Sequence, residues 1–165
     1  MWQRRSILTG GLAFTLTGGA TPKIRIYKGR EITRVVVQKI QRKMYLLSGS
    51  KVLRTYNVDL GFDPTGHKAV EGDGRTPEGP YYINRRNPNS RFHLSLGISY
   101  PNAADITRAK AMGLPPGGDI FIHGARRWFD KRGSDWTSGC ISVSNKEIEE
   151  IYAMVSDGTQ IDINP

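Results

Sequence analysis

The sequence predicts a mainly β domain with a few helices. Of its 165 residues, 38% are hydrophobic, and 19 glycines and 9 prolines indicate many turns and loops. This composition is globular and favours β structure over a helical bundle. The length suits one domain with a single sizeable core, and the chain has no internal repeat and no linker.

The first half of the chain predicts strands joined by turns. Residues 24–27 and 34–40 are β-branched or alternate apolar with polar side chains, so we expect a strand in each. Residues 43–60 predict two strands around a turn at Ser48-Gly49. Residues 61–79, rich in Gly, Pro and Asp, predict a long ordered loop that leads into a strand over residues 80–84.

The second half predicts further strands and two helices. We expect strands at residues 95–100 and 120–122, the latter ending at His123, and a short helix over residues 105–112. Ser144 and Glu147 form a capping-box pattern at the start of a second helix. One buried face of that helix is predicted by the spacing of Ile148, Ile151, Tyr152 and Val155. Gly158 ends the helix, and residues 159–163 predict a last strand.

Residues 1–20 have the layout of an export signal. They begin with Arg4 and Arg5, contain no acid, and end in small residues after a short, mildly apolar middle. Arg4-Arg5 followed by Ser6-Ile7-Leu8 resembles a twin-arginine signal. A disordered or membrane-associated tail is the alternative. We therefore expect a signal at 1–20, a single domain at 21–165, and a periplasmic or otherwise exported protein.

The net charge of +9 favours a polyanionic partner such as nucleic acid, anionic lipid or a carboxylate-rich polymer. The basic residues are spread along the chain, and no nucleic-acid-binding signature accompanies them. A solvated basic surface is therefore favoured over nucleic-acid binding. No stretch after residue 20 approaches the ~18 apolar residues that a membrane span needs.

Cys140 is the single cysteine, which excludes an intramolecular disulfide and a multi-cysteine metal site. A lone cysteine is often a small buried hydrophobic residue. Three neighbours favour a nucleophile instead: Gly139 directly before it, His123 seventeen residues upstream (140 − 123), and the predicted helix near Ser144, whose positive end favours a thiolate. A thiol nucleophile requires a base within reach and amide donors for the oxyanion.

The other two histidines, His67 and His93, are expected to be structural, with lining of a substrate site as the alternative for His93. No pair of histidines has helical ligand spacing, and no acid-bearing motif accompanies them. We therefore predict no metal site and no cofactor.

Several motifs together resemble the L,D-transpeptidase catalytic domain, also called the YkuD domain. They are His123-Gly124, Thr137-Ser138-Gly139-Cys140-Ile141 and the segment 72–79. Residues 87–93, 97–102 and 135–137 look like a Gram-negative branch of this family related to YafK/ErfK proteins. The likeness covers residues 34 to 163 and implies a β-sandwich catalytic core.

The resemblance further implies an acyl transfer on peptidoglycan stem peptides. Cys140 would attack the carbonyl of the third stem residue, usually diaminopimelate, and expel a terminal D-alanine. His123 would be the general base and acid, and the amides of Gly139 and Cys140 would hold the oxyanion. The acyl group would pass to the amine of another diaminopimelate or of a wall-linked lipoprotein.

Two positions depart from the commonest family pattern. Ser138 stands where many members have a second histidine, and Ser142 where many have Arg or Asn. Both are expected to border the substrate cleft. The candidate partners for stem carboxylates, through paired hydrogen bonds, are Arg91, Arg126 and Arg127.

Two other functions stay open from the sequence. One is an L,D-acting hydrolase that releases stem peptides or lipoprotein by using water as the acceptor. The other is a non-catalytic module that binds the cell wall through its basic surface.

Overall fold

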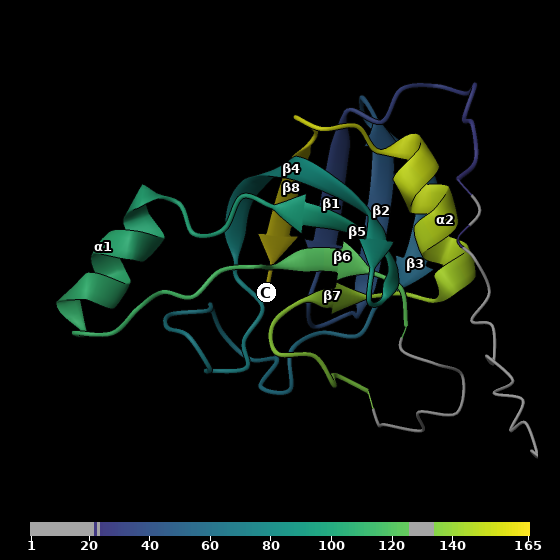
Figure 1. The fold of residues 1–165 in the computed structure, drawn as a ribbon. Helices are drawn as coiled ribbons and strands as arrows, with labels where there is room; N and C mark the ends of the chain where they lie inside the picture. The colour runs from purple at the N-terminus through teal and green to yellow at the C-terminus, as the bar shows by residue number, and fades with distance from the viewer. Residues whose placement is uncertain (1–21, 23, 126–133) are drawn as a thin grey trace, which may run out of the picture.

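The computed structural model describes residues 22, 24–125 and 134–165. The predicted export signal and the two arginines Arg126 and Arg127 lie outside the described residues. Within the described part the elements run β1 (Arg34–Gln38), β2 (Lys43–Ser48), β3 (Lys51–Asn57), β4 (Gly79–Ser90), β5 (His93–Ile98), α1 (Ala103–Ala111), β6 (Phe121–His123), β7 (Ile141–Ser142), α2 (Asn145–Met154) and β8 (Gln160–Asn164). These strands lie side by side while α1 projects away from them (Figure 1).

The strands form one mixed sheet in the order β3-β2-β1-β8-β4-β5-β6-β7. The pairs β1–β8 and β6–β7 are parallel, and the other neighbours are antiparallel. β4 belongs to both halves of the sheet, because its first residues pair with β8 and its later residues pair with β5. The register of β4 and β5 shifts between Ile83 and Arg85, an irregularity of the kind that increases bending.

The two ends of this strand order meet. Asp59 follows β3, the first strand in the order, and Ser142 belongs to β7, the last one. Asp59 N–H donates to Ser142 O at 2.9 Å, and Ser142 N–H donates to Asp59 O at 2.8 Å. The sheet therefore curls on itself until its ends touch, which confirms the predicted mainly β, sandwich-type architecture of the L,D-transpeptidase domain.

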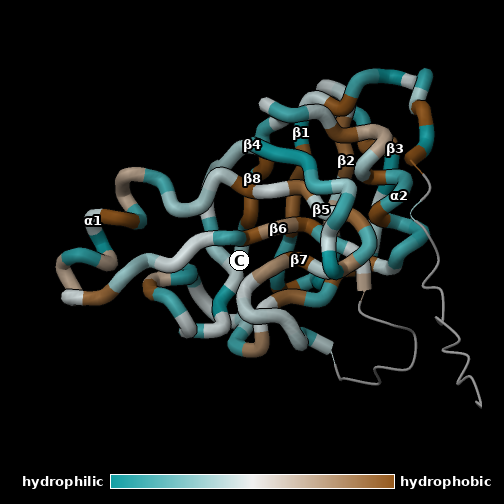
Figure 2. Tube along the Cα trace, in the orientation of Figure 1, coloured by the Kyte–Doolittle hydropathy of each residue, from teal (hydrophilic) through white to brown (hydrophobic). Residues whose placement is uncertain are grey.

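The core lies between the layers of the curled sheet. Alternate residues of the strands point inward, so each strand contributes apolar side chains to one face. Fully buried examples are Val35, Val37, Met44, Leu46, Tyr81, Ile83, Leu94, Leu96, Ile122, Ile141, Ile161 and Ile163. Figure 2 shows these hydrophobic segments gathered in the body of the molecule. Burial of such side chains supplies about 25 cal/mol per Å² of apolar surface.

Helix α2 begins and packs as predicted. The Ser144 side chain accepts from the Glu147 N–H, and the Glu147 carboxylate accepts from the Ser144 N–H, which completes the capping box. The predicted buried face is confirmed, since its four members are at most 5% exposed. α2 packs on β5 and β6. Arg86 of β4 donates to the carbonyl oxygens of Tyr152 and Val155, so it satisfies the open end of the helix.

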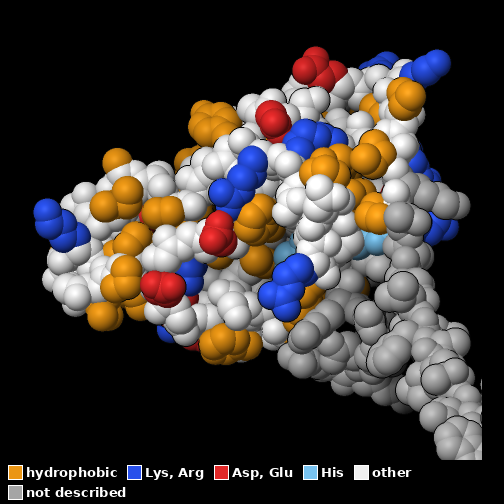
Figure 3. Space-filling view, in the orientation of Figure 1, with side chains coloured by type: hydrophobic (Ala, Val, Ile, Leu, Met, Phe, Trp, Pro, Cys, Tyr) orange, Lys and Arg blue, Asp and Glu red, His pale blue; other side chains and the backbone are white. Residues whose placement is uncertain are grey.

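Helix α1 begins earlier than predicted, at Ala103 rather than residue 105. Asn102 caps it and pairs reciprocally with Asp105, a signal that the sequence reading did not use. Asp105 is buried and accepts a hydrogen bond from Tyr81 Oη at 2.9 Å, which ties the base of α1 to β4. Exposed apolar side chains remain on this arm and just beyond it (Figure 3): Ile106, Met112 and Leu114.

Three segments differ from the predicted strands. Residues 24–27 form no strand; Ile24 and Ile26 are 64% and 86% exposed, and no neighbouring strand pairs with this segment in the described part. β4 extends to Ser90, because its polar half pairs with β5. The two-residue strand β7 was not predicted.

The described residues contain no helix long and apolar enough to cross a membrane.

Candidate active site

The parallel strands β6 and β7 bring His123 and Cys140 to neighbouring positions. Ile122 pairs with Ile141 and His123 with Ser142, and Cys140 directly precedes β7. The backbone N–H of Phe121 donates to the Cys140 sulfur. His123 lies two residues beyond Phe121 in β6, so their Cα atoms are roughly 7 Å apart and their side chains lie on the same face of the sheet. The topology thus places the predicted base and nucleophile on one face of adjacent strands.

His123 is held in a single tautomer. Its ring is buried, and Nδ1 lies 2.6 Å from the carbonyl oxygen of Gly124. Because a carbonyl only accepts, Nδ1 carries the proton and Nε2 keeps its lone pair. Gly124 N–H donates to Phe92 O at 3.0 Å. A Cβ on Gly124 would lie 2.7 Å from the backbone oxygen of Phe92, so only glycine fits beside the imidazole.

Two aromatic rings enclose the imidazole. Phe92 stacks on His123 with ring centroids 4.4 Å apart, and Trp136 meets the ring edge-on at 5.7 Å. Burial lowers the pKa of His123 below its ordinary value, although the bond to the Gly124 carbonyl opposes the shift. The imidazole is therefore an uncharged base at neutral pH. Phe92 and Trp136 carry no local sequence signal for this role, because only folding brings them to the ring.

Cys140 is partly exposed, and its thiol donates to the backbone carbonyl of Asp119 at 3.5 Å. Burial raises the pKa of Cys140, the Phe121 N–H opposes this, and the negative charge of Asp119 raises it further. The net shift favours the thiol over the thiolate in the free protein. The expected effect of the helix near Ser144 on the thiol stays a prediction. Within the described residues, no hydrogen bond joins the sulfur to the His123 ring.

The turn before Cys140 is fixed by Thr137. Its hydroxyl accepts from Gly139 N–H at 3.1 Å and donates to Cys140 O at 2.7 Å. The Gly139 amide is thus already bonded, which speaks against its predicted role as an oxyanion donor. The Cys140 amide donates to no acceptor in the part of the chain that is described. Of the two predicted donors, Cys140 N–H is the one that remains available.

Asp135 anchors this turn to a distant part of the chain. Its carboxylate binds Arg42, with Nη2 at 2.7 Å and Nε at 3.0 Å, and accepts from Leu60 N–H at 2.9 Å. Such paired charged hydrogen bonds fix both distance and orientation. The partners are 93 residues apart, so no local spacing could have revealed the contact.

The remaining predicted site residues divide into exposed and buried ones. Arg91 and Ser138 are exposed, the former in the turn between β4 and β5. Ser142 is only 2% exposed, which speaks against its predicted contact with substrate. It lies beside His123 in the sheet and serves the bridge to Asp59.

The other two histidines both have polar partners within the protein. His93 Nε2 lies 2.9 Å from the Glu149 carboxylate. His67 Nδ1 accepts from Glu78 N–H at 3.0 Å, and its Nε2 lies 3.0 Å from Asp105 Oδ1. No group of three or more metal-ligating side chains occurs among the described residues.

The fold and this site define an L,D-transpeptidase catalytic domain. The YkuD family model, the L,D-transpeptidase catalytic domain, matches residues 32–163, so the chain belongs to this family. The chain is 31% identical over 141 residues to YafK of Escherichia coli strain K12. That match covers 84% of this chain and 48% of YafK, so the chain spans about half the length of this relative.

Solved structures share the fold. The helical cell shape determining protein Pgp2 of Campylobacter jejuni is 26% identical, with a TM-score of 0.61 over 87% of this chain and 51% of that chain. Bd1075 of Bdellovibrio bacteriovorus is 23% identical, with a TM-score of 0.56 over 87% and 52% of the two chains. L,D-transpeptidase 1 of Mycobacterium tuberculosis matches at 14% identity, with a TM-score of 0.52 over 80% and 60%. The last two likenesses concern the fold alone.

Proposed function

We propose that this chain is an exported cysteine acyltransferase that carries out L,D-transpeptidation on peptidoglycan stem peptides through an acyl-enzyme on Cys140. Family membership supports the reaction class. The observation that carries the proposal is the His123 ring, fixed by the Gly124 carbonyl with Nε2 unprotonated, on the strand next to Cys140. A buried cysteine that served only packing would require neither this tautomer nor this neighbour.

The first half-reaction forms a thioester. A rotation about the Cα–Cβ bond of Cys140 turns the sulfur from Asp119 O toward His123, and Nε2 takes the thiol proton as the sulfur attacks the stem carbonyl. The Cys140 N–H donates to the oxyanion. The carbonyl carbon–nitrogen bond then breaks, and D-alanine leaves with the proton from the imidazolium. His123 is uncharged again, and the acyl group is on the sulfur.

The second half-reaction reverses these roles. An acceptor amine attacks the thioester carbonyl and gives its proton to His123 Nε2. The carbon–sulfur bond breaks, and the imidazolium returns the proton to the leaving sulfur. Atoms and charges balance without a cofactor, and His123 acts once as acid and once as base in each half. The acceptor is diaminopimelate of a second stem or the lysine of a wall-linked lipoprotein.

The location follows from the substrate and from the pattern of residues 1–20. Arg4 and Arg5, the absence of acids and the small residues at the end of this segment support export. Peptidoglycan is assembled outside the cytoplasmic membrane, so an enzyme that acts on it works in the periplasm. The excess of basic residues suits a wall polymer that carries carboxylates.

Purified stem tetrapeptides with and without an added amine acceptor test the proposal. We expect released D-alanine and a cross-linked product that requires the acceptor, and no product with Cys140→Ser. Shortened stems without cross-links would instead identify a hydrolase. Unchanged stems, together with wall binding that survives Cys140→Ser and weakens in salt, would identify a binding module.

A further inference from the structure

Two opposite charges that the proposed mechanism does not use lie next to the nucleophile. Asp119 lies in the loop that leads into β6, and Arg85 belongs to β4. Arg85 Nη2 donates to Asp119 Oδ1 at 2.6 Å, and the two side chains are 49% and 85% exposed. They form an ion pair at the surface.

Both charged residues are tied to the atoms around the sulfur. The backbone carbonyl of Asp119 accepts the hydrogen bond from the thiol at 3.5 Å. The Arg85 guanidinium lies 4.5 Å from the ring centroid of Phe121, whose N–H donates to the sulfur. The negative charge of Asp119 also raises the pKa of Cys140. A backbone contact of Asp119 and a ring contact of Arg85 therefore connect the ion pair to the surroundings of the sulfur, where the proposed acyl donor would bind.

An exposed ion pair is easily exchanged. Such pairs contribute little to stability, because water competes for both partners. Each partner can therefore leave the other for an opposite charge on a ligand. Asp119 offers a carboxylate to an ammonium group, and the planar guanidinium of Arg85 offers two parallel donors to a carboxylate.

We infer that Asp119 and Arg85 recognise a zwitterionic α-amino acid group on the side chain of the acyl-donor residue, with Asp119 binding its ammonium and Arg85 its carboxylate. This inference rests on the proposed function, because it places the donor at Cys140. Diaminopimelate carries such a group at the end of its side chain. Lysine lacks the carboxylate, and an amidated diaminopimelate lacks its charge.

The same contact couples recognition to reactivity. In the free protein the Asp119 charge works against ionisation of the thiol. A substrate ammonium on Asp119 offsets that charge, so the thiol becomes easier to deprotonate only when the correct donor is bound. Asp119 therefore restrains the free thiol and assists the occupied one.

Asp119→Asn tests this coupling, because the two effects have opposite signs. Alkylation of the free thiol by uncharged iodoacetamide should become about twofold to fivefold faster at fixed pH, since one negative charge near the sulfur is gone. In contrast, kcat/KM for a tetrapeptide with unmodified diaminopimelate should fall about tenfold, because a charged hydrogen bond is lost. A donor acetylated on the side-chain amine should show no such fall.

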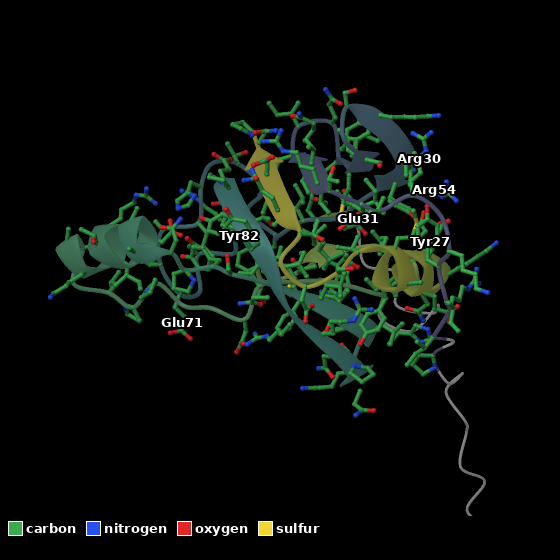
Figure 4. All side chains as sticks on the ribbon, turned by 90° about the horizontal axis from the view of Figure 1, so that it is seen from above. Tyr27, Arg30, Glu31, Arg54, Glu71 and Tyr82 are labelled. Carbon is green, nitrogen blue, oxygen red and sulfur yellow. The ribbon has the colours of Figure 1, made fainter. Side chains whose placement is uncertain are left out.

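Arg85→Gln tests the inferred contact between Arg85 and the side-chain carboxylate of the donor. It should remove the preference for diaminopimelate over its side-chain amide and leave the preference for a free amine. Arg54→Gln is the matched control, because Arg54 also forms an exposed ion pair, with Glu150 at 2.7 Å. Arg54 lies on the α2 side of the molecule, near Tyr27 (Figure 4). This variant should leave alkylation and donor preference unchanged.

Binding of the same donors to Cys140→Ala, measured by calorimetry, separates recognition from chemistry. Zwitterion-dependent binding that Asp119→Asn abolishes in this background supports the inference even if turnover fails, whereas absent turnover with every donor contradicts only the proposed function. The inference is overturned if Asp119→Asn leaves donor preference intact. It is equally overturned if alkylation and turnover fall together, because Asp119 would then only support the loop.

Discussion

Burial moves the pKa values of Cys140 and His123 in opposite directions, and both shifts favour the uncharged form. The pKa of the thiol is raised and the pKa of the imidazole is lowered. A resting thiolate–imidazolium pair would require the reverse. In the proposed mechanism, the sulfur therefore becomes a nucleophile only as His123 takes its proton. A protonated thiol is also less reactive toward oxidants.

The pH dependence of turnover follows from these directions. The ordinary pKa of histidine is 6.5, and that of His123 is lower. His123 is therefore mostly uncharged at pH 6.5 and becomes protonated only at more acidic pH. We expect kcat/KM to rise with an apparent pKa below 6.5 and to stay level through neutral pH. The ultraviolet absorbance of the thiolate should appear only in alkaline solution. A thiolate already present at neutral pH would contradict the uncharged resting pair.

Gly139 is a position at which one added carbon atom would disturb the turn before Cys140. Its φ is +124°, and an added Cβ would lie 2.6 Å from Arg75 O. Gly139→Ala should displace the Cys140 amide and lower kcat by ~100-fold or more, the usual cost of losing an oxyanion donor. Gly49→Ala is the control, because its φ is also positive but its Cβ would meet nothing within 4 Å. Equal activities of the two variants would exclude this role for the turn.

At the level of single residues, the sequence predicted those site residues that belong to short motifs. His123-Gly124 and Gly139-Cys140 are short motifs, and the structure places the first at the end of β6 and the second directly before the adjacent strand β7. The contacts of Asp119 and Asp135 have no such signal, because their partners lie in distant strands and turns. Ser142 was misjudged because closeness to Cys140 in sequence does not reveal that the next strand is buried.

At the scale of elements, the turn between β4 and β5 supports the base. Phe92 lies in this turn, stacks on His123, and accepts from Gly124 N–H through its carbonyl. His93, the residue after Phe92, holds this turn in place because its Nε2 lies 2.9 Å from the Glu149 carboxylate of α2. One side of the site is thus built from β4, β5 and α2 together.

Phe92→Ala should loosen this arrangement without removing any reacting group. Water would reach the imidazole, so its pKa should rise toward 6.5 and the acidic limb of the pH profile should move to higher pH. We expect about a tenfold loss of kcat/KM at neutral pH from the less well oriented ring. Phe92→Tyr should keep the stack and most of the activity. A loss of activity without movement of the acidic limb would mean that Phe92 acts only in folding.

Elements with strong local signals were predicted well. The capping box and the apolar spacing of α2 fix its start and its buried face. Residues 24–27 carry a similar apolar pattern but form no strand, because β pairing requires a partner that the local sequence does not show. β7 was missed for the complementary reason, since two residues form a strand here only through β6 and Asp59.

At the scale of the whole molecule, β8 joins the beginning and the end of the chain. It lies between β1 and β4, parallel to the former and antiparallel to the latter. The last strand is therefore central to the sheet. Composition predicted the fold class, but this order depends on pairings between segments more than 100 residues apart, for which the sequence has no periodic signal.

Ile161→Ala should consequently destabilise the entire domain. Ile161 is fully buried in β8, and replacing a buried isoleucine with alanine costs about 2–5 kcal/mol of unfolding free energy. Urea denaturation should show one transition at a lower midpoint, with the curve from fluorescence coinciding with that from circular dichroism. Ile26→Ala should change the midpoint little, because Ile26 is 86% exposed. Two separate transitions would contradict a single cooperative core.

The proposed function depends on a covalent intermediate on Cys140, which mass spectrometry of the enzyme quenched during turnover would detect. With a stem tetrapeptide as donor, we predict a mass increase equal to the donor less one D-alanine, located on the peptide that contains Cys140 and absent from Cys140→Ala. Acceptor should remove the adduct as cross-linked product forms. An unmodified Cys140 during active turnover, or an adduct that persists in Cys140→Ala, would exclude Cys140 as the nucleophile.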